Sequence, residues 1–400
     1  MRTPRRTMLS ALAATAVLAV TGCTGSAMEN QTSTPAKTLT IGFLAPQTGP
    51  LAAIGKDMLA GWNLYLDQHG GKLGGHQVKL VVADEGDGGP ATRAAVDKFI
   101  KADKVTAIVG AASAPAVSTT AGPATEAQIP FVGVGGRPSS LSDLRYIWHT
   151  SFASVDYGKA VGAHLAKTAD GPVYVIGPDY PGGHDQIGGF VQAFTAAGGK
   201  IANPGGKPVY TPYPATSNFA PWLTKIKDSG AKAVYAFYAG ANSVDFVRQY
   251  RQLVDGALPL YGPAFLTEGA ALPAQKDAAD KVFTVANYCA CIDNPANIAF
   301  AAAIRGRAGS EPNVYHMTSF DGAALLDKAI AAASAAGAGT PTPQAINEAI
   351  AALGALDSPR GSWRIDATTH TPVQGWYLRQ VTADNGAYTN KIVATLATAS

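Results

Sequence analysis

The chain has 400 residues, of which 47% are hydrophobic and 15% charged, a composition typical of a globular protein with a sizeable core and about two or three domains. Lys and Arg number 31 against 28 Asp and Glu, but residues 1–22 carry three arginines and no acid, so the rest of the chain balances at 28 of each sign (31 − 3 = 28). This balance leaves no basic patch and argues against a nucleic-acid partner.

The N-terminus has the pattern of an export signal. A positively charged start, MRTPRR, precedes the 13-residue apolar run MLSALAATAVLAV, which is too short to span a bilayer core of about 30 Å. The stretch VTGC (20–23) resembles a bacterial lipobox, in which the cysteine is lipidated and becomes the mature N-terminus. We therefore predict a lipoprotein signal peptide at 1–22 and a lipid anchor on Cys23. An ordinary secretory signal with a chance cysteine, and export by the twin-arginine route, stay open.

Residues 23–37 are small and polar and predict a flexible tether between the lipid and the folded part. The protein is thus expected outside the cytoplasm, on the outer face of the cell membrane. From residue 38 onward, short apolar strands alternate with amphipathic helices, which predicts βαβ units and parallel sheets.

The first α/β unit is expected to hold strands at 38–44, 78–84, 105–110 and 129–136, with helices at 56–70 and 91–103. The pattern restarts near residue 150, with a helix at 157–167 and strands at 172–177, 231–240, 258–265 and 281–288. Helices at about 319–337 and 343–353 and antiparallel strands within 362–396 complete the chain. Two such units place the carboxyl ends of their strands toward a shared crevice, where ligands of parallel-sheet folds bind.

Two residues of the first unit stand out as candidates for this crevice. Ser113 follows the strand at 105–110 where a helix begins, and its hydroxyl and the neighbouring amides suit a carboxylate. A plain helix cap is the alternative. Arg137, in FVGVGGRPSS (131–140), has the geometry to clamp a carboxylate with two hydrogen bonds, or it is an ordinary surface arginine.

Motifs of the common enzyme classes are missing. Each GGK triplet lacks the Ser or Thr that a P-loop needs for Mg²⁺, and neither GxSxG nor HExxH occurs. Pro138 stands where a dinucleotide fingerprint has its last glycine, and that loop follows the fourth strand rather than the first. His149 and His184 are isolated, as structural or exposed histidines usually are. We therefore expect no enzymatic activity, no cofactor and no metal.

Two cysteines remain in NYCACID, Cys289 and Cys291. A C-x-C pair without two further ligands nearby is a poor metal site. In an exported protein the pair forms either a small strained disulfide or two buried free thiols, and the sequence leaves both open.

Several stretches together resemble the branched-chain amino-acid-binding family, the type I periplasmic substrate-binding proteins of ABC importers. The resemblance covers 38–385, and order and spacing carry it rather than one motif. The stretches are QTGPLAAIGKDMLAGWNLYLDQHGG, VVADEGDGGPATRAAVDKFI, VTAIVGAASAPA, IPFVGVGG, PDYPGG, AKAVYAFYAG, LPLYGPAF and GSWRIDATTH followed by GWYLRQV.

The resemblance implies an α/β fold of two doubly wound parallel-sheet lobes around a cleft, joined by three crossovers near residues 153, 287 and 360. The lobes would comprise 38–153 with 288–360, and 154–287 with 361–400. It also implies a monomer that closes on a small-molecule ligand and delivers it to ABC permease subunits without catalysis.

The family's site residues map onto this chain only in part. The resemblance places Ser113 or the Ala114 backbone at the ligand carboxylate, and Gly135, Gly136 and Arg137 in the next loop that contacts it. In the second lobe, amino-acid-binding members have a carboxylate in a GPE-like turn that pairs with the ligand ammonium. The corresponding stretch here reads GPAF, with Ala264 and Phe265, and Glu268 lies four residues beyond Ala264.

An unpaired ammonium is costly to bury, so an ordinary α-amino acid does not fit this pattern well. The function predicted is capture of a small amino-acid-like or carboxylate ligand for an importer. A ligand-sensing lipoprotein, or a binder of aromatic or aliphatic carboxylates or amides, is the alternative. We favour a ligand with a carboxylate, an apolar or aromatic body and no ammonium. Its body would contact the aromatic residues Tyr180, Tyr238, Phe265 and Tyr288, each of which has core packing as its alternative.

Overall fold

The computed structural model describes residues 38–254, 258–337 and 339–397. The predicted signal peptide (1–22), Cys23 and the tether (23–37) lie outside the described residues. The described residues form one compact unit. Among the described residues, no helix is both long enough and apolar enough to cross a membrane.

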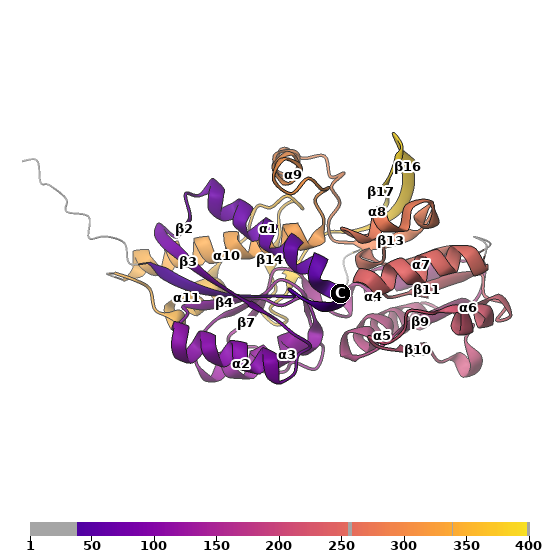
Figure 1. Cartoon of the computed structure of the whole chain (residues 1–400), viewed down its shortest axis with the longest axis horizontal. Helices are drawn as coiled ribbons and strands as arrows, with labels where there is room; N and C mark the ends of the chain where they lie inside the picture. The colour runs from indigo at the N-terminus through magenta and orange to yellow at the C-terminus, as the bar shows by residue number, and fades with distance from the viewer. Residues whose placement is uncertain (1–37, 255–257, 338, 398–400) are drawn as a thin grey trace, which may run out of the picture. The chain divides into compact units, whose positions relative to one another are not determined.

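A six-stranded sheet forms the first half of the fold, with the strand order β2-β3-β1-β4-β5-β7 (Figure 1). Its strands are β2 (Lys72–Leu73), β3 (His76–Asp84), β1 (Leu39–Ala45), β4 (Ala107–Gly110), β5 (Phe131–Gly133) and β7 (Ile147–His149). All neighbours pair in parallel except β2 with β3. The strand order reverses between β1 and β4, so the loops that follow these strands diverge and leave a crevice.

A seven-stranded sheet forms the second half, with the order β10-β9-β11-β12-β13-β16-β17. Its strands are β10 (Val209–Pro212), β9 (Val173–Asp179), β11 (Ala233–Ala236), β12 (Leu260–Pro263), β13 (Phe283–Ala286), β16 (Trp376–Asp384) and β17 (Ala387–Leu396). The first five pair in parallel, and the last two are antiparallel. The order reverses between β9 and β11. The predicted fold of two doubly wound parallel sheets is confirmed, as are the antiparallel strands at the C-terminal end.

Helices cover both faces of each sheet (Figure 1). The helices that pack around the first sheet are α1 (Ala52–Gln68), α2 (Pro90–Lys98), α3 (Ala114–Glu126), α9 (Pro295–Ala308), α10 (Val314–Ala336) and α11 (Pro343–Ala352). Those around the second are α4 (Asp156–Thr168), α5 (Pro181–Ala196), α6 (Ala220–Lys227), α7 (Gly240–Val254) and α8 (Ala271–Gln275).

Alternating side chains divide the core into layers. In β9, Val173 and Val175 belong to the cluster that includes α4 and α5, whereas Tyr174 and Ile176 belong to the cluster that includes α6 and α7. The first cluster continues through one face of the first sheet to α1 and α10, and a third cluster lies against α2 and α3. Because successive strand side chains point to opposite faces, each buried strand supplies two layers, which explains its nearly continuous apolar sequence.

Helix α10 begins at Val314, five residues before the predicted start at 319. The reason is a capping box. The Asn313 side chain accepts hydrogen bonds from the amides of Tyr315 and His316, and the His316 ring accepts the Asn313 amide. The box adds a turn that carries Tyr315 and Thr318, both of which become important below.

Three segments link the sheets, and buried polar side chains join them to one another. The Asn287 amide donates to the carbonyl of Ser151 at 3.2 Å and to the Gln374 side chain at 3.0 Å. Gln374 in turn donates to the Ser151 carbonyl at 2.7 Å. His370 still contacts the first sheet, because its carbonyl accepts the His149 amide at 2.9 Å. The lobe boundaries and the crossovers near residues 153, 287 and 360 stay a prediction.

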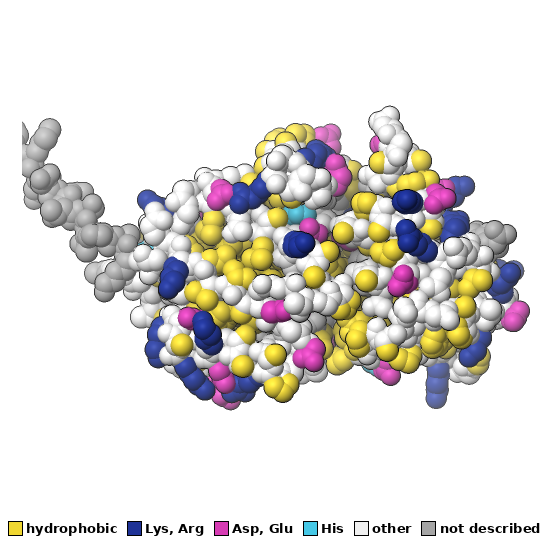
Figure 2. Space-filling view, viewed as in Figure 1, with side chains coloured by type: hydrophobic (Ala, Val, Ile, Leu, Met, Phe, Trp, Pro, Cys, Tyr) yellow, Lys and Arg dark blue, Asp and Glu magenta, His cyan; other side chains and the backbone are white. Residues whose placement is uncertain are grey.

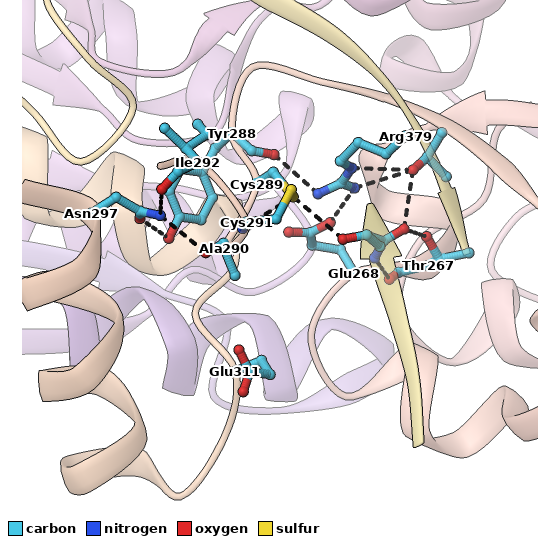
Figure 3. The surroundings of a disulfide bond; sticks show 12 residues. Thr267, Glu268, Tyr288, Cys289, Ala290, Cys291, Ile292, Asn297, Glu311 and Arg379 are labelled. Carbon is cyan, nitrogen blue, oxygen red and sulfur yellow. Dashed lines mark hydrogen bonds and ion pairs between the residues drawn. A yellow bond between two sulfur atoms is a disulfide. The ribbon is translucent and has the colours of Figure 1, made fainter. Parts of the chain in front are cut away.

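Two short two-stranded sheets lie at these links. They are β6 (Gly136–Arg137) with β8 (Phe152–Ala153), which is parallel, and β14 (Arg364–Ile365) with β15 (Pro372–Val373), which is antiparallel. Beside the second link, Cys289 and Cys291 form a disulfide (Figure 3), which resolves the alternative that the sequence left open. On the face shown in Figure 2, lysine and arginine side chains are interspersed with aspartate and glutamate, in keeping with the balanced charge.

Candidate ligand-binding site

A cavity lies between the carboxyl ends of the two sheets, and we call it the inter-sheet cavity. The first half contributes the loops after β1, β4 and β5, and the second contributes the loops after β9, β11 and β12, together with the first turns of α10. The cavity therefore lies where the strand order of each sheet reverses, beside the loops after β1 and β4 and those after β9 and β11. A doubly wound fold is expected to bind ligands at this position. The cavity has a volume of about 60 Å³, which is room for roughly four to six waters. It therefore fits a compact ligand.

One end of the cavity is polar and is built from the start of α3. Ser113 caps this helix, and its Oγ accepts a hydrogen bond from the Ala116 amide at 3.4 Å. Pro115 has no amide hydrogen, and the Ala114 amide has no acceptor among the described residues. The Ala114 amide and the Ser113 hydroxyl are therefore the groups that this end offers to a ligand carboxylate.

The floor of the polar end consists of glycines that have no room for a side chain. A Cβ on Gly135 would lie 2.4 Å from the Ala111 carbonyl oxygen, and a Cβ on Gly136 would lie 2.6 Å from the Phe152 ring. Behind them, the Nδ1–H of fully buried His149 donates to the Gly135 carbonyl at 3.0 Å. This packing fixes the loop after β5 against the cavity.

The remaining wall of the cavity is aromatic. Phe265 is central, with its ring centroid 5.5 Å from that of Phe152, 6.0 Å from that of Phe237 and 5.8 Å from that of Tyr315. Tyr180 extends the wall, 6.3 Å from Phe237. All five rings line the cavity, and such a wall suits an apolar or aromatic ligand body.

The structure brings six of the predicted site residues to the inter-sheet cavity. They are Ser113, Ala114, Gly135, Gly136, Tyr180 and Phe265. Their role in binding stays a prediction. The other four, Arg137, Tyr238, Ala264 and Tyr288, do not line it.

Arg137 was expected in the cleft, but it does not line the inter-sheet cavity. Adjacent residues of a strand point to opposite sides, so in β6 the side chain of Arg137 points away from the cavity that Gly136 lines. The Arg137 side chain lines a separate cavity, together with Asp156 and Lys159. Its Nη1 donates to the Pro138 carbonyl at 3.3 Å. Burial lowers the pKa of the Arg137 guanidinium, against the attraction of Asp156 and Asp185.

Three further predicted residues, Tyr238, Ala264 and Tyr288, do not line the inter-sheet cavity either. Tyr238 is 1% exposed, its ring packs on Phe246, and its hydroxyl hydrogen-bonds to Thr211 at 3.1 Å. Ala264 is fully buried beside Phe265. The Tyr288 hydroxyl donates to Asn297 at 2.7 Å inside the core.

Sequence reasoning missed other residues of the cavity. The sequence pointed to Tyr238 instead of its neighbour Phe237. Side chains alternate in direction along an extended segment, so Phe237 lines the cavity and Tyr238 packs in the core on the other side. Tyr315 and Thr318 were missed because the helix start was placed too late, whereas Asn313 was the capping signal that would have found them. Gln186 also lines the cavity, and its buried side-chain oxygen has no hydrogen-bond partner among the described residues.

No Asp, Glu, Lys, Arg or His of the described chain lines the inter-sheet cavity. Glu268, the acid nearest in sequence to the expected position, is engaged elsewhere (Figure 3). One of its oxygens pairs with Arg379 at 2.6 Å and the other accepts the Val314 amide at 2.9 Å. Glu268 is therefore already neutralised and does not face the cavity as a partner for an ammonium. Among the described residues, no group of three or more His, Cys, Asp or Glu side chains is arranged to hold a metal ion.

Comparison with known proteins agrees with this geometry. A family model described as periplasmic binding protein matches residues 38–387. The chain belongs to the periplasmic binding protein family. This family member is 29% identical to a Leu/Ile/Val-binding protein homolog of Brucella melitensis over 365 residues, which cover 89% of this chain and 90% of the relative.

Two solved structures show what the fold accommodates. A solute-binding protein of an R. palustris ABC transporter, in complex with 4-hydroxybenzoate, is 29% identical with a TM-score of 0.78, and the match covers 90% of this periplasmic binding protein and 96% of that chain. A branched-chain amino-acid transporter binding protein from Streptococcus pneumoniae, in complex with isoleucine, is 21% identical with a TM-score of 0.75, covering 90% and 99%. The second likeness supports the fold alone.

Proposed function

We propose that this periplasmic binding protein is the lipid-anchored, extracytoplasmic binding component of an ABC importer, and that it captures a small carboxylate with an aromatic or branched apolar body. The observation that carries the ligand class is the lining of the inter-sheet cavity: one end offers a hydroxyl and an amide, the rest is aromatic, and no charged side chain of the described residues faces it. The lipid anchor rests on the lipobox at Cys23.

The lining argues against an α-amino acid. Its ammonium would need an acceptor with negative charge inside the closed cavity, because an unpaired buried charge costs several kcal/mol. Glu268 is held by Arg379 instead. A benzoate-like ligand has no such group: its carboxylate matches Ser113 and Ala114, its ring matches the wall around Phe265, and Gln186 is available to a ring substituent. The 4-hydroxybenzoate bound to a 29% identical relative supports the same class.

A thermal-shift panel tests the ligand class on the chain from residue 24 onward. Benzoate, 4-hydroxybenzoate and branched aliphatic carboxylates are compared with leucine, isoleucine, valine and benzamide. A ligand at 100 times its dissociation constant stabilises the protein by about 2.7 kcal/mol, so we expect a clear rise in Tm with a carboxylate and none with the amino acids. A shift with leucine alone would contradict the proposal.

A matched pair of variants tests the orientation of the ligand. Ser113→Ala removes a donor to a charged group, worth about 1.5–3 kcal/mol, so carboxylate affinity should fall by about tenfold or more. Arg137→Ala should leave the affinity within about twofold, because its side chain lies in another cavity. The reverse ranking in isothermal titration calorimetry would restore Arg137 as the carboxylate clamp.

The importer role is tested separately from binding. Deleting the gene should abolish uptake of the radiolabelled ligand identified by the panel, and a Cys23→Ala chain should be released from the membrane fraction. Unchanged uptake with intact ligand binding would favour a sensor lipoprotein of the same fold.

A further inference from the structure

A buried carboxylate stands directly behind the polar end of the inter-sheet cavity. Glu85 follows β3 and is fully buried. One of its carboxylate oxygens accepts the Ala112 amide at 2.6 Å, and the other accepts the Ser113 amide at 3.0 Å. The Thr92 hydroxyl donates to the Glu85 backbone carbonyl and holds the residue in place.

Both amides belong to the loop between β4 and α3, and this loop also lines the cavity. Amides at the start of a helix are the groups that commonly bind an anion, and here Glu85 already takes two of them. An ionised Glu85 therefore places a negative charge behind the position at which we expect the ligand carboxylate. Two carboxylates that share a site do not both ionise without a large cost.

The Ser113 hydroxyl connects the two positions. The Ser113 side chain lies close enough to the Glu85 carboxylate to lower the pKa of that group, its Oγ accepts the Ala116 amide, and it lines the cavity. A hydroxyl has a single hydrogen to donate. While Glu85 is ionised, we expect that hydrogen to point to Glu85. When Glu85 carries a proton, Glu85 donates to Ser113 Oγ, and the hydroxyl hydrogen becomes free for a ligand carboxylate.

We propose that Glu85 is a positioning residue that couples binding to protonation: a ligand carboxylate enters the inter-sheet cavity together with one proton from solvent, which Glu85 takes up. The ligand charge and the proton balance, so the net charge of the site is unchanged. This inference rests on the proposed function, since it concerns carboxylate ligands.

Burial raises the pKa of Glu85 to about 7, against the hydrogen bonds from Ala112 and Ser113 and with a further rise from the charge of Asp84. The residue is thus half-ionised near neutral pH in the empty site. A second negative charge in the cavity favours the protonated form further. Coupling should therefore appear at and above neutral pH, whereas below about pH 6 Glu85 is already protonated and no proton is taken up.

The groups that surround Glu85 do not titrate in this range. Burial alone would raise the pKa of Asp84, but hydrogen bonds from Gln47, Thr48 and Gly86 together lower it, so Asp84 stays ionised. Across the cavity, burial raises the pKa of the Tyr180 and Tyr213 hydroxyls, so both rings stay neutral.

The charged groups on the α2 side of Glu85 face solvent. Asp87 is exposed, and the Arg93 side chain is 51% exposed and pairs with Asp97. Solvent screens such groups, so Glu85 is the titrating group at this end of the cavity.

Calorimetry of the chain from residue 24 onward, with benzoate as probe, tests the coupling directly. At pH 8, titrations in buffers of different ionisation enthalpy should report uptake of about one proton per benzoate, and at pH 5.5 uptake near zero. The dissociation constant should rise about tenfold per pH unit above neutrality. Benzamide, which has no charge, should bind without proton uptake at either pH.

Glu85→Gln tests the residue. Glutamine keeps an acceptor for the Ala112 amide and a donor toward the Ser113 hydroxyl, loses the acceptor for the Ser113 amide, and does not ionise. Benzoate affinity of this variant should stay constant between pH 6 and 8.5, at about the value of the unchanged protein at pH 6. Asp87→Asn, an exposed acid two residues away, should keep the pH dependence.

The outcomes separate the two proposals. Benzoate binding without proton uptake, or a Glu85→Gln variant that keeps the full pH dependence, overturns the role of Glu85 and leaves the proposed function intact. If no carboxylate binds at any pH, both are overturned. If Glu85→Gln does not fold, the proton count of the unchanged protein decides alone.

Discussion

Replacing Arg379 with methionine should lower the free energy of unfolding by about 3–5 kcal/mol, because it leaves the Glu268 carboxylate charged and buried without its partner. The two side chains are only 2% and 4% exposed, and their charged atoms lie 2.6 Å apart. Arg379 also donates to the Tyr288 carbonyl at 3.0 Å and to the Thr284 hydroxyl at 3.2 Å. Figure 3 shows the contacts of Arg379 with Glu268 and Tyr288. Urea unfolding followed by circular dichroism measures the loss.

Two further variants show whether the charge is the cause. Lys391→Met removes a cation from the neighbouring strand, whose pair with Asp384 is exposed (51% and 43%), and should change stability by at most about 1 kcal/mol. Glu268→Gln combined with Arg379→Met should be more stable than Arg379→Met alone, since no buried charge remains. A loss below about 1 kcal/mol for Arg379→Met would show that the pair contributes no more than a surface one.

Lowering the pH from 6.5 to 3 should remove about 4–5 kcal/mol of stability through His149 alone. Burial lowers the pKa of this ring to about 3, against the hydrogen bond to Gly135 and with a further lowering from the charges of Arg137 and His370. In the unfolded chain His149 has a pKa near 6.5 and takes up a proton as the pH falls from 6.5 to 3. In the folded chain the ring stays neutral until the pH approaches about 3. Each pKa unit is worth about 1.36 kcal/mol, so stability is full above pH 6.5 and falls with pH.

Urea unfolding at several pH values, with His149→Asn alongside, measures this contribution. Asparagine keeps a donor for the Gly135 carbonyl but does not titrate, so the variant should be less stable near neutrality and lose less stability in acid. His184→Asn, at an exposed position, is the matched control and should follow the unchanged protein. Equal acid slopes for His149→Asn and the control would refute the assignment.

The order of strands and helices was predictable because apolar runs and amphipathic periods are local features of the chain. Elements such as α11 (Pro343–Ala352), predicted at 343–353, matched closely for this reason. The start of α10 was missed because the capping box of Asn313 lies outside the apolar pattern. Which loops would line the cleft was predictable as well, since parallel strands place their carboxyl ends together.

Individual side chains at the site were less predictable. A shift of one residue along an extended segment reverses the direction of a side chain, and this reversal separates Gly136 from Arg137 and Phe237 from Tyr238. The partners of buried charges were not predictable at all. Glu268 and Arg379 are 111 residues apart, and Glu85 lies 28 residues from Ser113, so no local pattern links them.

The sequence by itself therefore determined the α/β class, because the alternation of strands and helices follows from periodicity along the chain. Its resemblance to a known family implied the two doubly wound sheets. Tertiary structure alone decided that Arg137 leaves the cavity, that Glu268 is neutralised by Arg379, and that Glu85 stands behind Ser113. These are contacts between segments distant in sequence, and only folding brings their charges within hydrogen-bonding distance.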